Sequence, residues 1–304
     1  MKLLEGKAIV ITGAGAGLGA AYARHAARRG ARLVLNDVAS DAADRIAAEI
    51  RAQGGDARAS AGDVSSWAYA AELIQACVGA FGRIDGLINN AGILRHGRVT
   101  EMTEADLRAM LDVNLVGAAA CGTHAVKAML AQGAPASVVN VASGSQAGDI
   151  ALGGYGATKA AVASLTFSWA LELRDTNVRV NALSPLAHTA MAESNMRHLA
   201  EQSASREVVY TTLPDAEVSA PAAAFLLSDR SIGVTGQVLR IAGNELSFIT
   251  HPMIAEPVLT GDWTDEAIEA AFRQTLAARQ QRLGLAYEGA KPSAAGYQKP
   301  RGDV

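Results

Sequence analysis

Residues 7–19 read Lys-Ala-Ile-Val-Ile-Thr-Gly-Ala-Gly-Ala-Gly-Leu-Gly, and this stretch decides the fold. It begins as a short β-branched run, passes into a glycine turn and continues into residues 20–29, which are rich in alanine and arginine and typical of a helix. Such a strand–turn–helix start forms a cradle for a dinucleotide, because glycines let the backbone approach the pyrophosphate and the helix N-terminus favours its charge. The strict Gly-x-Gly-x-x-Gly pattern is not met, since the turn reads Thr-Gly-x-x-x-Gly-x-Gly with Gly13, Gly17 and Gly19. The stretch therefore predicts a βα unit that binds a nucleotide.

A carboxylate after the next apolar run indicates which dinucleotide is bound. Residues 32–36 form that run, and Asp37 follows it, about twenty residues beyond the glycine turn. A carboxylate there accepts both hydrogen bonds of an adenosine ribose diol and repels the 2′-phosphate of NADP. Residue 16, just before Gly17, is alanine, so the turn itself offers no cation for that phosphate. An ordinary loop carboxylate is the alternative, and the spacing favours NAD.

A serine, a tyrosine and a lysine form a second pattern in the middle of the chain. Ser143 follows an apolar run, and Tyr155 and Lys159 share one face of an alanine-rich helix at positions i and i+4. An ammonium close to a phenol favours the phenolate, so Lys159 is expected to lower the tyrosine pKa from its usual value of about 10 toward neutrality. Ser143 would hydrogen-bond the same substrate oxygen. Tyr-x-x-x-Lys also occurs by chance in helices, but downstream of a nucleotide unit it predicts acid–base chemistry.

The rest of residues 1–247 alternates between strand and helix patterns without internal repeats. This alternation predicts a single α/β domain, a doubly wound Rossmann-type fold with a seven-stranded parallel sheet. Ligands of such sheets bind beyond the carboxyl ends of the strands, where several polar residues and glycines are expected to gather. Residues 190–214 break the alternation and contain methionines, so they are expected to be either a lid or a plain surface loop. The strands are expected near residues 7–12, 32–37, 57–62, 84–89, 137–142, 178–183 and 237–241.

Residues 248–304 are predicted to form a C-terminal extension. Thr264, Asp265 and Glu266 are typical of a helix start, and the apolar residues after them lie on one stripe, which predicts a helix over about 264–283. The last twenty residues contain glycine, proline and lysine and are expected to form a flexible or wrapping tail.

Charge and cysteine content exclude several classes of partner. The chain has 304 residues, 19% of them charged, and a net charge of −3, so we expect no nucleic-acid partner and no anionic membrane surface. Cys77 and Cys121 lie in predicted helices away from any Cys-x-x-Cys or Cys/His cluster, which indicates reduced thiols and no metal site. No uninterrupted apolar run reaches the roughly 18 residues of a membrane span, so we expect a cytoplasmic protein.

With these residues the chain resembles the ordinary single-domain branch of the short-chain dehydrogenase/reductase family over residues 3–245. Six motifs stand in the family's order: the Gly13 turn, Asp63-Val64, Asn89-Asn90-Ala91-Gly92, Asn114, Ser143, and Tyr155 with Lys159. The resemblance implies that Asn114, Ser143, Tyr155 and Lys159 are catalytic, with Asn114 holding the water of a proton relay through Lys159. It also implies a homodimer or homotetramer that pairs through the helices carrying Asn114 and Tyr155. The NAD-binding residues that it implies are Gly13, Gly17, Leu18, Gly19, Asp37, Asp63, Val64, Asn90, Ala91, Gly92, Tyr155, Lys159, Pro185 and Thr189, the last of these meeting the nicotinamide carboxamide.

Two segments resemble one group within this family. Residues 89–95 (NNAGILR) and 35–38 (LNDV) are similar to the (3R)-hydroxyacyl-CoA dehydrogenase part of peroxisomal multifunctional enzymes and to 17β-hydroxysteroid dehydrogenases. Leu186 and Asn244 depart from the family, which often has glycine at both positions. The resemblance implies an NAD-dependent oxidoreductase that interconverts a secondary alcohol and a ketone, with a 3-hydroxyacyl-CoA or a hydroxysteroid as substrate. The alternatives are a 3-oxoacyl reductase, a small cyclic alcohol or diol dehydrogenase, and a redox-silent nucleotide sensor, although sensors usually lack part of the Ser, Tyr and Lys set.

Overall fold

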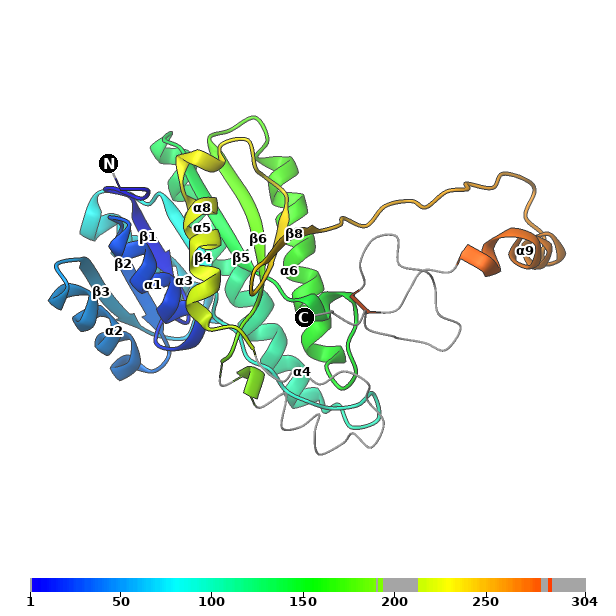
Figure 1. The fold of residues 1–304 in the computed structure, drawn as a ribbon, viewed down its shortest axis with the longest axis horizontal. Coiled ribbons are helices and arrows are strands. Elements are labelled where there is room, and N and C mark those ends of the chain that lie inside the picture. The colour runs from blue at the N-terminus through cyan, green and yellow to red at the C-terminus, as the bar shows by residue number, and fades with distance from the viewer. Residues whose placement is uncertain (1, 190, 194–212, 280–283, 286–304) are drawn as a thin grey trace. The chain divides into compact units, whose positions relative to one another are not determined.

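The computed structural model describes residues 2–189, 191–193, 213–279 and 284–285 (Figure 1). The chain separates into two compact units, Met1–Ile249 and Thr250–Val304. The boundary that the sequence analysis placed after residue 247 falls inside the last strand of the first unit, Glu245–Ile249.

The first unit is built on one sheet whose strands run in the order β3-β2-β1-β4-β5-β6-β7-β8. Strands β1 to β7 are parallel, as expected, and β8 is an additional strand that runs antiparallel to β7. A two-residue loop makes this addition possible, because Gly243 adopts a positive φ of 59° between the paired residues Ala242 and Glu245. The strands are β1 Ala8–Ile11, β2 Arg32–Asp37, β3 Asp56–Ala61, β4 Gly86–Asn89, β5 Ala136–Val141, β6 Val178–Leu186, β7 Val238–Ala242 and β8 Glu245–Ile249.

Helices cover both faces of the sheet (Figure 1). Helix α3 illustrates how the local sequence sets their limits: the Ser66 hydroxyl accepts a hydrogen bond from the backbone N–H of Tyr69 at its start, and Gly82 ends it in the left-handed conformation. The α-helices of this unit are α1 Gly17–Arg28, α2 Ser40–Ala52, α3 Trp67–Phe81, α4 Glu104–Met110, α5 Ala118–Gln132, α6 Gly153–Glu172 and α8 Ala220–Leu227. Four shorter turns complete them: the π-helical η1 Leu111–Gly117, which joins α4 to α5, and the 3₁₀ turns η2 Gly144–Ala147, η3 Ala216–Ser219 and η4 Asp229–Ser231.

Neighbouring residues of the central strands pack into two different cores. In β1, Ile9 and Ile11 belong to a buried cluster with residues of α1 and α8, whereas Ala8 and Val10 belong to a second cluster with residues of α3 and α5. This division follows from the alternation of side chains along a strand. Burying each large side chain contributes about 1.5–3 kcal/mol, so both faces of the sheet hold the carboxyl strand ends in place.

The second unit contains a short helical segment. The Thr264 hydroxyl accepts a hydrogen bond from the backbone N–H of Ala267 and caps α9 Asp265–Ala271, where the sequence predicts a helix start. The chain continues as the π-helical η5 Phe272–Leu276 and the 3₁₀ turn η6 Ala277–Arg279, while the predicted end at 283 and the tail after Leu285 lie outside the described residues. The apolar stripe lines a hollow within this unit together with the segment before it, through Pro257, Leu259, Trp263, Ile268, Ala271, Phe272 and Leu276.

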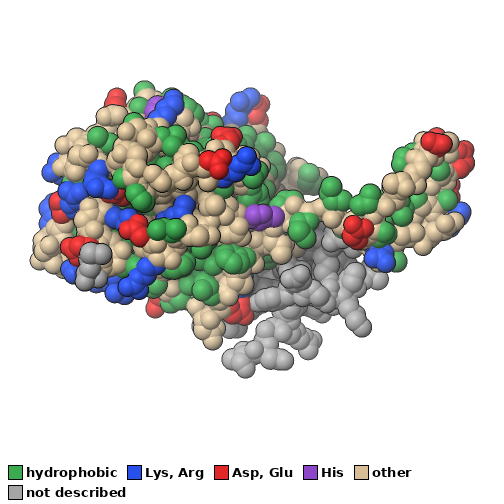
Figure 2. Space-filling view, turned by 90° about the horizontal axis from the view of Figure 1, so that it is seen from above, with side chains coloured by type: hydrophobic (Ala, Val, Ile, Leu, Met, Phe, Trp, Pro, Cys, Tyr) green, Lys and Arg blue, Asp and Glu red, His purple; other side chains and the backbone are tan. Residues whose placement is uncertain are grey.

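Surface and thiol features complete the description. On the face shown in Figure 2, acidic and basic side chains are interspersed over the first unit. Both cysteines are buried and unpaired, and burial raises each thiol pKa to about 12. One helical segment among the described residues, Glu104–Gln132, has the length and apolar composition of a membrane span, and 44% of its most apolar window is buried within the protein.

Candidate active site

The glycine turn lies at the carboxyl end of β1, where its backbone is packed too closely for side chains. Gly13 and Gly17 have positive φ angles of 61° and 50°, which favour glycine. A Cβ added at Gly13 would lie 2.9 Å from the Cα of Ala91, and one added at Gly19 would collide with the carbonyl oxygen of Gly13. The turn is therefore bare backbone at the start of α1, which is the surface that a pyrophosphate needs.

The end of β4 braces this turn. The side-chain N–H₂ of Asn90 donates hydrogen bonds to the carbonyl oxygens of Thr12 and Gly13, both at 3.0 Å. In return the Thr12 hydroxyl oxygen accepts from the backbone N–H groups of Asn90 and Ala91, also at 3.0 Å. The Asn90 side chain therefore holds the backbone of the glycine turn in its shape. Thr12 was not among the predicted site residues, although its position directly before Gly13 could have indicated a role in holding the turn.

Asp37 closes the adenosine side of the turn. Its Oδ2 atom accepts a hydrogen bond from the backbone N–H of Gly15 at 2.9 Å, and its Oδ1 atom accepts one from Ala39 at 3.0 Å. The guanidinium of Arg45, from α2, donates to the Gly15 carbonyl oxygen at 2.9 Å. A cation from α2 therefore contacts the glycine turn, a contact that residues within the turn do not indicate.

The next strand end contributes Asp63 and Val64. The Asp63 carboxylate accepts a hydrogen bond from the backbone N–H of Ser65 and so holds its own turn. Val64 is buried, and a Cβ added at Gly117 in η1 would lie 2.8 Å from its Cγ2 atom. Val64 therefore packs tightly against η1 directly after β3, while Asp63 stays exposed.

Ser143, Tyr155 and Lys159 come together as the sequence predicts. Ser143 lies two residues after β5, and hydrogen bonding by its hydroxyl lowers the pKa of the Tyr155 phenol. Tyr155 and Lys159 lie on the first turns of α6, both almost fully buried, with the Lys159 Nζ atom 5.7 Å from the centre of the Tyr155 ring. Lys159 also donates a hydrogen bond to the Val141 carbonyl oxygen at 2.7 Å, which fixes its ammonium below the phenol.

The electrostatics of this group differ from the sequence-based expectation. Burial raises the pKa of Tyr155 above its usual value, and the Ser143 hydrogen bond opposes that rise. Burial likewise lowers the pKa of Lys159 to about 8. The expectation that Lys159 draws the Tyr155 pKa toward neutrality is therefore wrong in direction for the protein by itself, because burial dominates and only the Ser143 hydrogen bond opposes it. An oxidised nicotinamide carries a positive charge, and when bound beside the phenol it would favour the phenolate.

Asn114 is buried in the π-helical turn η1, and its side-chain amide is committed to the protein. Its Oδ1 atom accepts from the backbone N–H of Ile93 at 2.7 Å, and its Nδ2 atom donates to the Ile93 carbonyl oxygen at 2.9 Å and to the Thr158 hydroxyl at 3.0 Å. Both amide hydrogens are thus used, so the side chain has only one lone pair left with which to hold a relay water. Its visible role is to clamp the Ile93 segment to α6.

The end of β6 lies next to the glycine turn. A Cβ added at Gly17 would be 3.5 Å from the Cγ2 atom of Thr189, which places that threonine beside the dinucleotide cradle. The Thr189 hydroxyl oxygen accepts a hydrogen bond from the backbone N–H of Ala192 and starts a short turn. Pro185 belongs to β6 itself and pairs with Ile241. Most of the predicted lid, including Met196, Arg197, Leu199 and Arg206, lies outside the described residues.

Apolar side chains surround the exposed edge of Tyr155. It forms a cluster with Met110 and Leu152, against which Ile93, Leu94 and Met191 pack. The neighbouring segment is held by a hydrogen bond from the Gly97 N–H to the carbonyl oxygen of Ala151. Ala151 has a positive φ of 59°, a strained conformation of the kind that gathers at functional sites.

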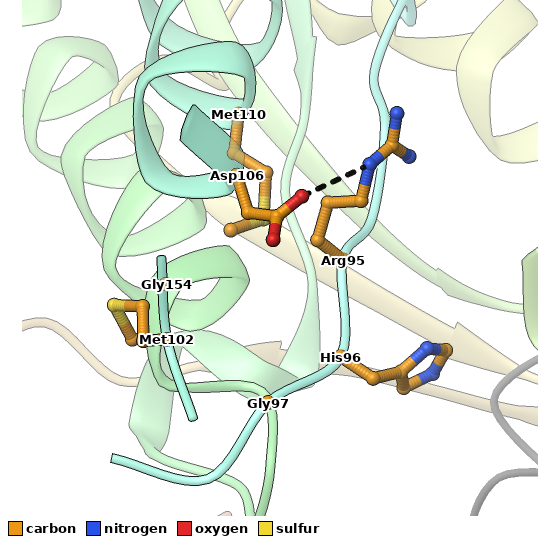
Figure 3. Close-up of a pocket in the computed structure, with 7 residues that line it drawn as sticks. All are labelled: Arg95, His96, Gly97, Met102, Asp106, Met110 and Gly154. Carbon is orange, nitrogen blue, oxygen red and sulfur yellow. Dashed lines mark ion pairs between the residues drawn. The ribbon is translucent and has the colours of Figure 1, made fainter. Parts of the chain in front are cut away.

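A small hollow borders this cluster. Arg95 and Asp106 face each other across it, with their Nε and Oδ1 atoms 3.6 Å apart (Figure 3). The hollow is lined by Arg95, His96, Gly97, Met102, Asp106, Met110 and Gly154. A guanidinium paired with a carboxylate therefore stands beside the apolar cluster around Tyr155.

These residues fit a nicotinamide dinucleotide. Along the sheet, Asp37 at the end of β2, the bare glycine turn after β1, and the buried phenol and ammonium beside the end of β5 follow one another as the adenosine ribose, pyrophosphate and reacting ring of such a dinucleotide would. Among the described residues no group of three or more His, Cys, Asp or Glu side chains is arranged to hold a metal ion.

Comparison with known proteins agrees with this arrangement. A short chain dehydrogenase family model matches residues 7–200. The hydroxyacyl-CoA dehydrogenase ChsB1 of Mycobacterium tuberculosis is 34% identical over 91% of this chain and 90% of its own length. A 3-oxoacyl-[acyl-carrier-protein] reductase FabG of Thermotoga maritima is 35% identical over 79% of this chain and 98% of its own length. The crystal structure of a short chain dehydrogenase from Mycobacterium avium is 30% identical, with a TM-score of 0.81 over 95% of this chain and 100% of that one. The chain therefore belongs to the short-chain dehydrogenase/reductase family and is an oxidoreductase that acts on an alcohol or a ketone.

Proposed function

We propose that this oxidoreductase uses NAD to interconvert a secondary alcohol and a ketone on a bulky, largely apolar substrate, a 3-hydroxyacyl-CoA or a hydroxysteroid. The observation that carries the proposal is the grouping of Ser143 with the buried Tyr155 and Lys159, whose Nζ atom lies 5.7 Å from the centre of the Tyr155 ring, next to an apolar cluster. This group can hold an alcohol oxygen and accept its proton, while the apolar cluster can cover a hydrocarbon body.

In the oxidative direction, Tyr155 as phenolate takes the proton of the substrate hydroxyl. Ser143 holds the same oxygen by a hydrogen bond, so the C–H bond of the carbinol carbon points at one position. A nicotinamide bound there supplies the hydride acceptor. Lys159 stabilises the phenolate by its charge, and the burial of Tyr155 and Lys159 strengthens that interaction.

The proposal of NAD over NADP rests on Asp37. Its carboxylate lies against the Gly15 N–H, at the place where the adenosine ribose leaves the glycine turn. A 2′-phosphate would meet this negative charge at close range. The Arg45 guanidinium, which contacts the Gly15 carbonyl oxygen of this turn, would weaken the repulsion of the 2′-phosphate. We therefore expect a moderate preference for NAD over NADP.

The substrate class rests on two further observations. Met191, Ile93 and Leu94 add apolar surface around Tyr155, and Met191 can adapt to an irregular hydrocarbon shape. Similarity to the hydroxyacyl-CoA dehydrogenase ChsB1 continues over 91% of the chain, whereas that to the 3-oxoacyl reductase stops at 79%. A match of the larger share must include part of the C-terminal extension, which supports the acyl-CoA assignment. The 3-oxoacyl reductase remains the second candidate on the ground of that relative.

We also propose that the chain forms a homodimer or homotetramer and acts in the cytoplasm on small molecules, without nucleic acid or membrane partners. Apolar side chains left exposed on the helices expected to pair support the oligomer: Val116 in η1, Leu130 in α5 and Leu171 in α6.

A substrate panel tests the proposal. NAD⁺ reduction would be followed with 3-hydroxyacyl-CoA esters, hydroxysteroids, short secondary alcohols and sugars, with NADP⁺ as the matched cofactor control. We expect kcat/KM on one of the two bulky classes to exceed that on short alcohols by at least about tenfold, since several buried methylenes each add binding energy. Equal or better turnover of a small polar alcohol would contradict the substrate proposal and leave the family assignment in place.

A further inference from the structure

Two buried threonines of α6 make the same pair of hydrogen bonds. The Thr158 hydroxyl accepts from the Nδ2 atom of Asn114 at 3.0 Å and donates to the carbonyl oxygen of Tyr155 at 2.8 Å. The Thr166 hydroxyl accepts from the Nδ2 atom of Asn140 at 3.0 Å and donates to the carbonyl oxygen of Val162 at 2.9 Å. Both threonines are 0% exposed, so the two motifs share geometry and burial.

The two motifs end on different parts of the protein. The Asn140 Oδ1 atom accepts a hydrogen bond from the Asn89 Nδ2 atom, between β4 and β5 in the interior. Asn114 instead clamps the backbone of Ile93, whose side chain packs on the apolar cluster around Tyr155. The acceptor of Thr158 is the backbone of Tyr155 itself.

We propose that Thr158 is a positioning residue for the alcohol–ketone reaction. One hydroxyl ties the backbone of Tyr155 to Asn114 and, through Asn114, to the Ile93 wall of the substrate side. The Tyr155 phenol and the Ile93 side chain, which borders the substrate side, therefore keep a fixed distance from each other. Without this hydroxyl, a buried Asn114 N–H loses its acceptor, and the amide must turn or draw in water to satisfy it.

The glycine turn and Lys159 are held by hydrogen bonds that do not pass through this link. Lys159 is held by the Val141 carbonyl oxygen, and the glycine turn is held by Thr12 and Asn90. Loss of the Thr158 hydroxyl should therefore lower the rate of the chemical step and leave NAD binding almost unchanged. A loosened Tyr155 would also have a weaker hydrogen bond to Ser143, and because that bond lowers the Tyr155 pKa, the pKa seen in the kcat profile should rise.

The test compares Thr158→Val with Thr166→Val, which removes the matched hydroxyl away from the site. We expect Thr158→Val to lower kcat by about tenfold or more, to keep the NAD Kd within about twofold, and to move the pH profile of kcat upward. Thr166→Val should lose similar thermal stability and keep both kcat and the pH profile. Thr158→Ser should restore the rate, since it keeps the hydroxyl. Equal kcat values for the two valine variants would overturn the proposal.

Two further measurements cover the remaining outcomes. If Thr158→Val does not fold, Thr158→Ser and Thr158→Cys replace it in the test. These two variants differ only in having oxygen or sulfur at the same position, and sulfur forms weak hydrogen bonds. The kcat of Thr158→Cys should therefore be at least about fivefold lower than that of Thr158→Ser. Hydrogen exchange at the Ile93 amide, which Asn114 protects, needs no substrate: it should quicken in the Thr158 variant and stay unchanged in the Thr166 variant. The role of Thr158 rests on the proposed alcohol–ketone activity only for the rate measurement. A wild-type protein without turnover would therefore count against the proposed function, and the exchange result would still decide on Thr158.

Discussion

The proposed preference for NAD rests on Asp37, whose carboxylate accepts from the Gly15 N–H while the Arg45 guanidinium donates to the Gly15 carbonyl oxygen. A carboxylate facing a phosphate across a hydrogen-bond distance costs about 1 kcal/mol or more even when it is well solvated. That figure corresponds to a preference for NAD of about fivefold or more.

The Asp37→Ala variant should therefore narrow the ratio of kcat/KM for NAD over NADP by about fivefold or more. Asp37→Asn is the matched control, since it keeps an oxygen acceptor for the Gly15 N–H and removes only the charge. If charge is the cause, both variants should narrow the ratio, and adding Arg45→Gln should weaken NADP use again. Comparable kcat/KM values for the two cofactors in the wild type would show that Asp37 does not select between them.

Sequence patterns alone predicted which residues gather at the site, and much less about how each is used. Ser143, Tyr155 and Lys159 were predictable because strand ends and an i, i+4 helix face set their positions. The raised Tyr155 pKa was not, since it depends on how many atoms of other elements exclude water from the phenol. The committed amide of Asn114 was equally hidden, because its partners Ile93 and Thr158 lie 21 and 44 residues away along the chain.

At the scale of elements, the turn between β1 and α1 and the end of β4 form one rigid piece. Asn90 donates hydrogen bonds to Thr12 from its backbone N–H and from its side-chain N–H₂. Gly19 lies against both the Gly13 carbonyl oxygen and the Asn90 side chain, and a Cβ added at Gly19 would be 2.7 Å from the Asn90 Nδ2 atom. A single methyl group at residue 19 would have to push backbone aside.

We predict that Gly19→Ala weakens NAD binding by at least about tenfold and lowers the free energy of unfolding by about 1–3 kcal/mol, the usual cost of overpacking. Gly79→Ala is the control: it lies in α3 with open space around the added methyl, and alanine in a helix should raise stability by about 0.5–1 kcal/mol. Calorimetry of NAD binding and urea unfolding would measure both. A Gly19 variant with unchanged NAD affinity would contradict the role given to the turn.

The parallel strands were predictable to within three residues, most of them because they are compact apolar or β-branched runs; β3, which reads Asp-Ala-Arg-Ala-Ser-Ala, follows instead from the alternation of strands and helices. Strand β8 was missed for a physical reason: it has two exposed apolar residues, Leu246 and Phe248, and no buried face that gives a clean alternation. It forms because a two-residue loop with Gly243 returns the chain beside β7. Its pairing comes from backbone hydrogen bonds, which leave little trace in the residue pattern.

At the scale of the whole molecule, the chain consists of a catalytic unit and an extension that the matched part of FabG does not reach. Apolar side chains of the extension, including Met253 and Ile254, are not covered by their own unit. Such a surface is expected to bury against a substrate cleft or a second subunit.

We therefore predict that truncation after Ile249 changes either the oligomer size or the substrate KM, while the NAD Kd stays within about twofold because the glycine turn and Asp37 lie in the first unit. Ile254→Asp should act in the same direction as the truncation, and Glu269→Gln, on the polar side of α9, should have no effect. Size-exclusion chromatography with light scattering and steady-state kinetics would follow the change. An unchanged mass together with unchanged kinetics would make the extension an independent appendage.

We propose that the Tyr155 oxygen accepts the proton of the substrate hydroxyl when the alcohol is oxidised to the ketone. Tyr155→Phe removes that oxygen and keeps the ring, and Tyr22→Phe is the matched control, a buried tyrosine of α1 whose hydroxyl accepts only from Ser219. The most direct test is kcat of both variants, measured beside their NAD Kd by calorimetry. We predict that Tyr155→Phe lowers kcat by about 10²–10⁴-fold with the NAD Kd within about twofold, and that Tyr22→Phe keeps wild-type kcat. A Tyr155→Phe protein that retains more than about a tenth of the wild-type kcat would contradict the mechanism.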